Sequence, residues 1–419
     1  MGWVARACGL SAAALALTAC TADAGSRESV ALGPEVVADT SAPSGYTVTF
    51  RYEDAEADRV WLAGDLYYAD AADIRLEGAT QSWLGDDWTE GDASTLPVAT
   101  DLAELTRGED GVWEITTAVP AGLWNYGFVT SGCSLILLCA VAEDPANPPP
   151  LATANTATQA WSQVFVPVDE DHPTYDASTE IPVDADQRGT VSRVDDPDLG
   201  VYLPAGYDPD RAEPYPLLVL SHGAGDDETA WFTQGGAAEQ LDHAIAAGVI
   251  EPTVAVTTDF TGLSAAGMDD PEFFDLYVDL ITASVLPYAE RELHTSTDPA
   301  DRSFAGLSMG GRLAEHLMLT QPGLFGSYGM WSMPAAVNDT PAAALTQAQL
   351  TTAATASAVH LGTGAQDSLT PTPREFADLA AAYEGAGMLA TTLETDGGHA
   401  WWVWRRMLAD FLETTALRR

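Results

Sequence analysis

Residues 306–310, GLSMG, fit the pattern GxSxG, in which a serine can serve as a nucleophile. The chemistry requires glycines on both sides because the serine must stand on a tight turn from a strand into a helix, with its oxygen exposed. A strand-like segment, RSFAGL, precedes the motif, and a helix-like segment, RLAEHLMLT, follows it. This context favours a nucleophile over a glycine-rich turn without a chemical role, so we predict that Ser308 attacks an acyl carbon.

A histidine must take the proton of this serine, because a neutral hydroxyl is a poor nucleophile. Three histidines follow Ser308 in the chain. His316 lies about two turns into the helix that begins at the serine and cannot reach back to it. His360 lies inside the apolar segment SAVHLGTG, where a core histidine is expected. His399 follows two glycines in a loop, so we predict that it is the general base.

A carboxylate must fix the tautomer of that histidine. Asp367 comes directly after the segment HLGTGAQ, past the end of a predicted strand. We favour it as the acid because a carboxylate on a separate loop can approach the imidazole edge opposite the serine. Asp396 and Glu394, which lie close to His399 in the chain, are the alternatives.

Two backbone N–H groups should stabilise the oxyanion that forms in such a reaction. The residue after the nucleophile, Met309, is the first predicted donor. The second should come from the loop in LSHGAGDDETAW, which follows a buried strand and contains glycines that let the backbone approach a substrate. We favour the N–H of Ala224, with Gly223 as the alternative.

Polar and aromatic side chains near these segments are candidates for contacts with an aryl or sugar group of a substrate. The candidates are His222, Trp231, Arg312, Trp331 and Trp401. Trp401 and Trp404 are three residues apart, which is typical of the buried face of a helix, so packing in the core is the default expectation for most of the tryptophans.

Metal-binding patterns are weak in this sequence. It contains neither HExxH nor a paired cysteine–histidine spacing. His222 with Asp226 and Asp227 has the chemistry of a cation site, but a solvated turn is the more usual role of such residues. We expect neither a metal nor another cofactor.

Strand-like and helix-like segments alternate after residue 168. PLLVLSH, TVAVTTDF, RSFAGL, SYGMWSM and SAVHLGTG are typical of buried strands, and PEFFDLYVDLITASVLPYAEREL is typical of an amphipathic helix. The alternation predicts an α/β fold for residues 168–419, with a mostly parallel central sheet covered on both faces. Ligands are expected at the carboxyl ends of the strands.

Residues 46–167 have a different pattern. YTVTFRY, RVWLAGDLYY and GVWEITTAVPAGLWNYGFVT are short strand-like runs punctuated by glycine and proline. They predict a smaller all-β sandwich that precedes the α/β region.

The N-terminal residues predict export. Residues 1–20 combine one positive charge at Arg6 with a short apolar stretch, and LTAC at 17–20 is typical of a lipoprotein signal, with acylation of Cys20. Cleavage after Ala24, which would release a soluble protein, is the alternative. Residues 21–45 are predicted to be a flexible tether. In an exported chain Cys133 and Cys139 are expected to form a disulfide, with two buried thiols as the alternative.

The charge of the chain limits its partners. It has 62 acidic and 17 basic residues and a formal net charge of -45. Nucleic acids and anionic lipid surfaces are therefore disfavoured, and the membrane is expected to be contacted only through the lipid anchor. A small-molecule or glycan-linked ester is the expected substrate.

Several segments together resemble a known superfamily. VYLPAGYD, LLVLSHGAGDDETAW, RSFAGLSMGG, LGTGAQD and GGHAWWVWRRMLADFL occur in the order and spacing of the esterase D superfamily of α/β-hydrolases, over about residues 190–415. This superfamily includes feruloyl esterases, enterochelin esterases and mycolyltransferases. The resemblance implies the same triad of Ser308, Asp367 and His399 and the same oxyanion donors. Two departures, Ala400 in place of an aspartate and MWSMPAA in place of a serine–glycine turn, bear on the substrate.

The N-terminal region also resembles part of that superfamily. The stretch from GVWEIT through AGLWNYGF to DPANPP is similar to the immunoglobulin-like N-terminal domain of enterochelin-esterase-type proteins, which is related to glycogen-binding modules. Residues and resemblance together predict an exported serine hydrolase that cleaves a carboxylic ester through an acyl-enzyme. Acyl transfer of the mycolyltransferase type is one alternative, and an inactive glycan-binding lipoprotein is the other.

Overall fold

The structure is a computed structural model. It describes residues 31–74, 79, 81–95, 97, 102–132, 139–152, 159–169, 171–172, 177–267, 270–334, 345–370 and 373–417. The predicted signal peptide with Cys20 and one of the two predicted disulfide cysteines, Cys133, lie outside the described residues. Cys139 is buried in a small apolar cluster, and its bridge to Cys133 stays a prediction.

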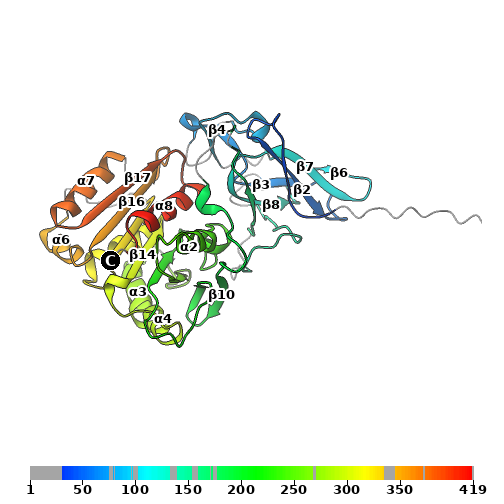
Figure 1. Ribbon diagram of the computed structural model, residues 1–419. Helices are drawn as coiled ribbons and strands as arrows, with labels where there is room; N and C mark the ends of the chain where they lie inside the picture. Colours follow the sequence, from blue (N-terminus) through cyan, green and yellow to red (C-terminus); the bar gives the residue numbers. More distant parts are fainter. Residues whose placement is uncertain are drawn as a thin grey trace, which may run out of the picture. The chain divides into compact units, whose positions relative to one another are not determined.

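An eight-stranded sheet forms the centre of the C-terminal region (Figure 1). Its strand order is β10-β11-β13-β12-β14-β15-β16-β17. The first two strands run antiparallel to their neighbours, and the other six are parallel. This confirms the predicted α/β fold. The strands are β10 (Thr190–Asp195), β11 (Asp198–Leu203), β12 (Leu217–Ser221), β13 (Val254–Thr258), β14 (Arg302–Leu307), β15 (Ser327–Trp331), β16 (Ala358–Gly364) and β17 (Leu389–Thr395).

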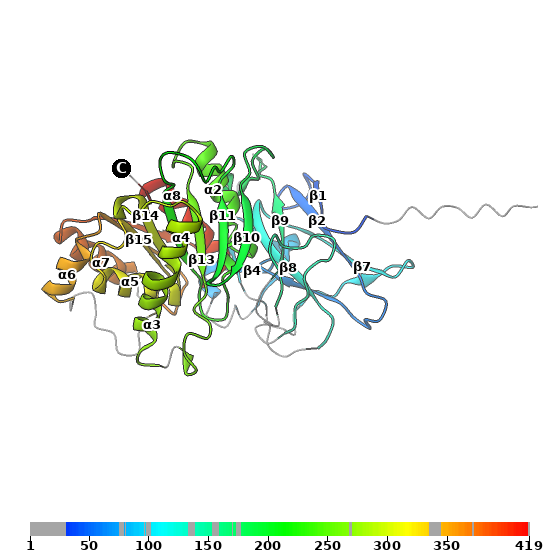
Figure 2. The same ribbon diagram turned by 90° about the horizontal axis from the view of Figure 1, so that it is seen from below.

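Helices cover both faces of this sheet. Figure 2 shows α2 and α8 on one side of it and α3 and α5 on the other. No described helix is long and apolar enough to cross a lipid bilayer. The helices are α1 (Ala230–Thr233), α2 (Ala237–Ala246), α3 (Phe273–Leu280), α4 (Leu286–Glu292), α5 (Met309–Thr320), α6 (Gln347–Ala353), α7 (Pro373–Gly385) and α8 (Trp401–Thr414).

The segment predicted as one long amphipathic helix is interrupted. Helices α3 and α4 are joined by a π-helical turn, Ile281–Val285. Pro287 at the start of α4 explains the interruption, because proline lacks the N–H that an α-helix needs and its ring clashes with the carbonyl one turn earlier.

Alternate residues of each strand supply the two core layers. In β12, Leu217 and Val219 pack with residues of α3, α4 and α5. Leu218 and Leu220 pack on the opposite face with residues of α2 and α8. This alternation, with every residue of β12 buried, is what a central parallel strand covered on both faces requires.

Apart from short 3₁₀ turns such as Ala71–Asp73 and Gly85–Asp87, the described regular elements of the N-terminal region are β-strands. Two main sheets have the orders β1-β2-β7-β6 and β3-β8-β9, and β4 pairs with β5. The all-β character is as predicted, whereas its immunoglobulin-like type stays a prediction. The strands are β1 (Glu35–Ala38), β2 (Tyr46–Glu53), β3 (Trp61–Gly64), β4 (Tyr68–Asp70), β5 (Asp92–Ser94), β6 (Thr106–Arg107), β7 (Val112–Ala118), β8 (Gly122–Val129) and β9 (Ser162–Val166).

The prediction that residues 21–45 form a flexible tether is wrong for Glu35–Ala38. Strand β1 lies within that range and pairs antiparallel with β2. The segment EVVA carries two adjacent valines, which favour a strand, and backbone hydrogen bonds to β2 hold it at the sheet edge. The surrounding residues are small and polar, so the composition of the segment did not indicate this short strand.

One buried arginine connects the N-terminal sheets to the α/β region, and residues Leu32–Arg419 form one compact unit. Arg405 in α8 is fully buried. Its guanidinium donates to the carbonyl oxygens of Leu123 in β8 and Gln234, the latter at 2.9 Å, and to Oδ2 of Asp65 at 3.3 Å. Burial raises the pKa of Asp65, and the charge of Arg405 opposes that shift.

Replacing this arginine should destabilise the fold strongly. Arg405→Leu leaves the Asp65 carboxylate and two carbonyl oxygens without their cation, which should lower the free energy of unfolding by about 3–5 kcal/mol. Arg291→Leu is the matched control because Arg291 pairs with Glu292 at the surface, where a pair contributes less than about 1 kcal/mol. Guanidinium unfolding followed by tryptophan fluorescence measures both. Equal losses in the two variants would contradict the role of Arg405.

Candidate active site

Ser308 stands between β14 and α5 in a strained conformation. Its φ is 51° and its ψ is −117°, a region that residues other than glycine seldom adopt. Its backbone N–H donates to the carbonyl of Trp331 at 2.8 Å, which ties the turn to the end of β15. The side chain is half-buried, at the N-terminal end of α5.

The flanking glycines are required by close packing. A Cβ on Gly306 would lie 2.4 Å from backbone atoms of Gly310. A Cβ on Gly310 would lie 2.6 Å from the carbonyl oxygens of both Ser221 and His222. The turn that carries Ser308 is therefore pressed against the end of β12, and the GxSxG pattern reflects a steric condition of this site.

His399 and Asp367 are hydrogen-bonded. Nδ1 of His399 lies 2.8 Å from Oδ2 of Asp367. The other carboxylate oxygen accepts the N–H of Leu369 at 3.1 Å, and the Asp367 side chain is fully buried. If Nδ1 donates to the carboxylate, Nε2 is left as a proton acceptor. Asp396 and Glu394, the alternative acids, are both exposed.

The sheet topology brings these loops to one edge. Strands β12, β14, β16 and β17 are all parallel, so their carboxyl ends share an edge. Ser308 follows β14, Asp367 follows β16 and His399 follows β17. The ring of Trp404 in α8 contacts the imidazole of His399 edge-on, with the ring centroids 5.0 Å apart.

The two other histidines after Ser308 have different surroundings. His360 is fully buried in β16, where its Nδ1 accepts from Nε1 of Trp331 and its Nε2 lies 2.8 Å from Asp410. It is a satisfied core histidine, as its apolar segment predicted. His316 lies in α5 beside Asp275, and burial lowers its pKa.

The loop after β12 lies beside the serine. A Cβ on Gly223 would lie 3.2 Å from the Cβ of Ser308. Ala224 is exposed at the next position. Met309 is the first residue of α5, so its N–H has no partner within the helix. These positions suit the predicted oxyanion donors.

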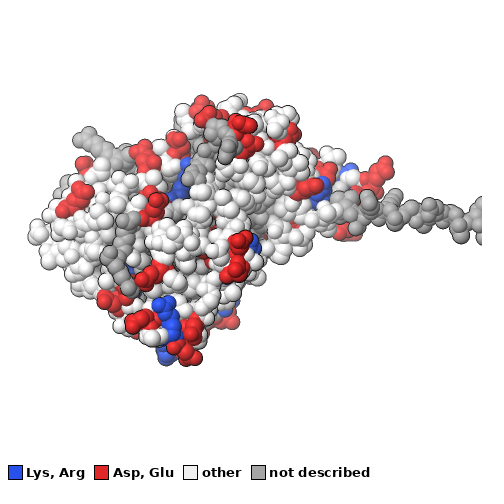
Figure 3. Space-filling model, viewed as in Figure 1, with Lys and Arg blue, Asp and Glu red and all other residues white. Residues whose placement is uncertain are grey.

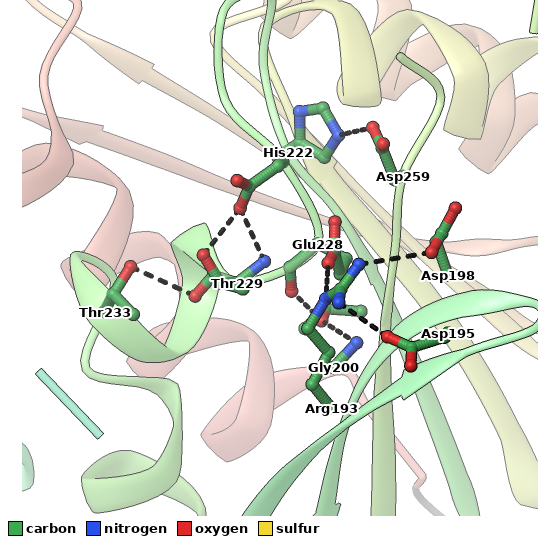
Figure 4. Close-up of polar contacts among 11 residues, drawn as sticks. Arg193, Asp195, Asp198, Gly200, His222, Glu228, Thr229, Thr233 and Asp259 are labelled. Atoms are coloured by element: carbon green, nitrogen blue, oxygen red, sulfur yellow. Dashed lines mark hydrogen bonds and ion pairs between the residues drawn. The ribbon is translucent and has the colours of Figure 1, made fainter. Parts of the chain in front are cut away.

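The side chain of His222 connects this loop to the loop after β13. Its Nδ1 lies 2.7 Å from the carbonyl oxygen of Gly223. Its Nε2 lies 3.2 Å from Oδ1 of Asp259, a contact that Figure 4 shows. The imidazole also stacks on Phe260, with the ring centroids 4.1 Å apart. Burial alone would lower the pKa of His222, but the Asp259 carboxylate and neighbouring acceptors outweigh it and raise the pKa.

This environment corrects one prediction. His222 was a candidate for substrate contact, but its side chain is only 1% exposed and both nitrogens face protein acceptors. Its buried pairing with Asp259, a residue on the loop after β13, could not be read from the sequence.

The next residues of the loop are fixed by charged and hydroxyl groups (Figure 4). The buried carboxylate of Glu228 pairs with Arg193 of β10, which also contacts Asp195 and Asp198. The N–H of Thr229 donates to Oδ1 of Asp227 at 2.9 Å. These contacts anchor the segment that follows the predicted oxyanion donors.

The predicted pocket tryptophans belong to the core. Trp231 and Trp331 are fully buried and Trp401 is 7% exposed. Trp231 contacts Trp331 and Trp401 edge-on, with centroid separations of 5.7 and 5.1 Å. They fill the layer between the sheet and α8, so the default expectation of core packing is confirmed and their candidacy for a substrate pocket is wrong. Arg312 pairs with Glu315 one turn along α5, at 2.7 Å.

Asp226 has a perturbed environment that was not predicted from the sequence. It was expected only as a weak cation ligand or as part of a solvated turn. Burial raises the pKa of Asp226 to about 6, although the charges of His222 and His399 and a hydrogen bond from Gln234 act against that shift. The adjacent acidic pair in HGAGDD was the available signal. Among the described residues, no group of three or more His, Cys, Asp or Glu side chains could hold a metal ion.

Comparison of the sequence with known protein families identifies the family of this chain. The family model Esterase, described as "Putative esterase", matches residues 194–415. The chain belongs to this family. The matched residues include the turn at Ser308, Asp367 and His399.

Two curated relatives are similar to the α/β region. "Endo-1,4-beta-xylanase/feruloyl esterase" from Xylanibacter ruminicola is 31% identical over 221 residues, which cover 50% of this chain and 28% of that protein. "Endo-1,4-beta-xylanase Y" from Acetivibrio thermocellus is 33% identical over 132 residues, which cover 29% of this chain and 11% of that protein. The chain thus spans less than a third of the length of either relative.

A solved structure extends the similarity in fold. The enterobactin esterase FES from Shigella flexneri aligns with a TM-score of 0.53 and 17% identity, over 91% of this chain and 95% of that one. At this identity the alignment shows a shared fold. It includes the N-terminal β-sheets as well as the α/β region.

The packing at the serine turn generates a first prediction for this candidate site. Gly310→Ala should reduce ester hydrolysis at least about tenfold and lower the unfolding midpoint, because the added methyl must push the end of β12 away from the turn. Gly385→Ala is the matched control, since a Cβ there meets no atom within 4 Å. Initial rates on a p-nitrophenyl ester and thermal unfolding measure both effects. Full activity in Gly310→Ala would contradict the steric argument.

The raised pKa of Asp226 generates a second prediction. Its folded value of about 6 lies above the ordinary value of 3.8, so its contribution to stability is present below about pH 4 and is lost as the pH rises through 6. Asp226→Asn should therefore raise the free energy of unfolding at pH 8 by on the order of 1–3 kcal/mol, with a smaller gain toward pH 4.

Urea unfolding at the two pH values tests this, with Asp378→Asn on the exposed face of α7 as the control. A gain that does not depend on pH would contradict the assignment.

Proposed function

We propose that this protein is an exported carboxylic-ester hydrolase that acts through a covalent acyl-enzyme on Ser308. The observation that carries the proposal is the strained Ser308 turn, which in a member of an esterase family stands at the same sheet edge as a hydrogen-bonded His399–Asp367 pair. Residues held in strained backbone conformations cluster at active sites and ligand-binding sites, where the surrounding structure compensates for their cost.

In the first step Oγ of Ser308 attacks the ester carbonyl carbon, and its proton passes to Nε2 of His399. Asp367 holds the imidazole and stabilises its positive charge. The oxyanion accepts hydrogen bonds from the N–H of Met309 and from that of Ala224, with Gly223 as the alternative. The imidazolium then gives its proton to the alcohol oxygen as the C–O bond breaks, which releases the alcohol.

In the second step water attacks the acyl-enzyme, and His399 takes one proton of that water. The second tetrahedral intermediate collapses, Ser308 recovers its proton from His399 and the carboxylic acid leaves. An alcohol in place of water would give acyl transfer. A protein that keeps the Ser308 turn but does not react with esters would be a binding protein. Acyl transfer and binding alone are both outcomes of the test below.

An ester linked to a glycan is the substrate that we propose. Both curated relatives are named as endo-1,4-beta-xylanases, and the name of one also includes feruloyl esterase. The formal charge of -45 disfavours strongly anionic substrates and nucleic acids, and Figure 3 shows acidic side chains outnumbering basic ones on the visible face. We also propose export with a lipid anchor at Cys20 and a disulfide between Cys133 and Cys139, on the sequence patterns alone.

Replacing the serine should remove the reaction and leave the fold. Ser308→Ala should lower kcat for methyl ferulate and p-nitrophenyl acetate by on the order of 10⁴-fold or more. Its thermal midpoint should stay within a few degrees of that of the wild type. Ser192→Ala, at an exposed position of β10, is the matched control and should keep full activity.

An alanine variant that hydrolyses both esters at the wild-type rate would overturn the assignment of Ser308. A wild-type protein that forms an acyl-enzyme but yields a new ester in the presence of an added alcohol would replace hydrolysis by acyl transfer. A wild-type protein without reaction toward any ester would favour the binding protein.

A further inference from the structure

The carbonyl oxygen of Gly223 accepts two hydrogen bonds. Nδ1 of His222 lies 2.7 Å from it, and the backbone N–H of Asp226 donates to it at 3.4 Å. The second bond closes a tight turn in which Gly225 adopts a φ of 95°, a conformation that favours glycine. The direction of this carbonyl is therefore fixed from two sides.

The same peptide unit contains the N–H of Ala224. The Gly223–Ala224 peptide bond is trans and planar, so its N–H points opposite to its carbonyl oxygen. Because the carbonyl points to the buried His222, the N–H points away from that side chain, and Ala224 itself is exposed. No described residue accepts a hydrogen bond from this N–H. An N–H that is fixed in direction and unpaired is what an oxyanion requires.

The peptide unit before it has a different orientation. A Cβ on Gly310 would lie 2.6 Å from the carbonyl oxygen of His222, so this carbonyl faces the turn that carries Ser308. The N–H of Gly223 belongs to the same planar unit as that carbonyl and therefore points away from Gly310. The geometry favours Ala224 over Gly223 as the second oxyanion donor.

Both ring nitrogens of His222 face groups that can only accept hydrogen bonds. These groups are the carbonyl oxygen of Gly223 and the carboxylate of Asp259, so Nδ1 and Nε2 must each carry a hydrogen to bond them. His222 is then an imidazolium with Asp259 as its counter-ion. Oδ1 of Asp259 also accepts the N–H of Thr261 at 2.6 Å, and Phe260 stacks on the imidazole. These contacts hold the ring in one orientation.

A charged donor at the carbonyl oxygen also changes the peptide unit electronically. Hydrogen bonds in a chain polarise one another, and a bond from a charged donor is stronger than one between neutral groups. The imidazolium of His222 should therefore make the N–H of Ala224 a stronger donor to an oxyanion.

We propose that His222 is a positioning residue for the oxyanion, which orients and polarises the N–H of Ala224 through the carbonyl oxygen of Gly223. Asp259 holds the imidazole in place for this role. The inference rests on the proposed function and identifies how the fold fixes the second oxyanion donor. His222 acts through this peptide unit and does not contact the substrate.

Removing the imidazole should slow the reaction without weakening substrate binding. His222→Leu should lower kcat for p-nitrophenyl acetate about 10–100-fold and leave KM within about twofold, because the oxyanion exists only after attack on the carbonyl carbon. His222→Asn should keep kcat within about fivefold of the wild type, because the N–H of the new amide can take the place of Nδ1–H.

His360→Leu is the matched control for this change. It also removes a buried histidine that is bonded to a carboxylate, that of Asp410. It should lower the thermal midpoint but leave kcat unchanged.

Inhibition by a trifluoromethyl ketone separates the proposed role from a general loss of structure. The ketone forms a tetrahedral adduct with a reactive serine, and its oxygen then lies where the oxyanion of an ester would lie. The inhibition constant should rise about 10–100-fold in His222→Leu. It should stay near the wild-type value in His222→Asn and in His360→Leu.

Asp259→Asn tests the same role with a smaller change. The amide oxygen can still accept from Nε2, but the charge opposite the imidazolium is lost, so kcat should fall about 3–10-fold at constant KM. Asp410→Asn makes the same change beside His360 and should leave kcat unchanged.

An unchanged kcat in His222→Leu or, if that variant does not fold, in Asp259→Asn would overturn the inference. Equal losses of kcat in His222→Leu and His222→Asn, or a loss that appears only in KM, would also overturn it. A wild type that hydrolyses no ester and is not inhibited by the ketone would instead overturn the proposed function.

Discussion

The structure depends on a steric constraint at the turn between β14 and α5. Ser308 adopts a left-handed φ, and Gly310 touches the carbonyl oxygens of Ser221 and His222 so closely that no side chain fits. A side chain at position 310 would therefore push the end of β12 away from the turn. Because β12 continues into the loop of Gly223 and Ala224, the same contact that shapes the serine also places the predicted oxyanion donors next to it.

Buried charges support this arrangement from both sides. His222 with Asp259 and Arg193 with Glu228 hold the loop after β12, and Arg405 joins the N-terminal sheets to α8. Buried pairs are costly to desolvate and contribute little net stability, but they fix geometry because a lone partner would be far worse. The cost of desolvation is evident at Asp226, where burial disfavours the charged carboxylate and raises its pKa.

The sequence predicted those features that have a local cause. The GxSxG turn, the alternating strands and the core role of His360 follow from short-range sterics and periodicity. It could not decide which side of a layer a tryptophan faces, so Trp231 and Trp331 stayed candidates for a pocket beside the default of core packing, and they fill the core.

Two other features needed contacts between distant segments. Strand β1 owes its order to β2, and the burial of His222 depends on Asp259. The proposed mechanism requires that Ser308 be an activated nucleophile. Labelling with a fluorophosphonate, followed by peptide mass spectrometry, measures this activation. We expect one adduct, on Ser308, that disappears in His399→Gln; labelling at another residue, or none, would contradict the mechanism.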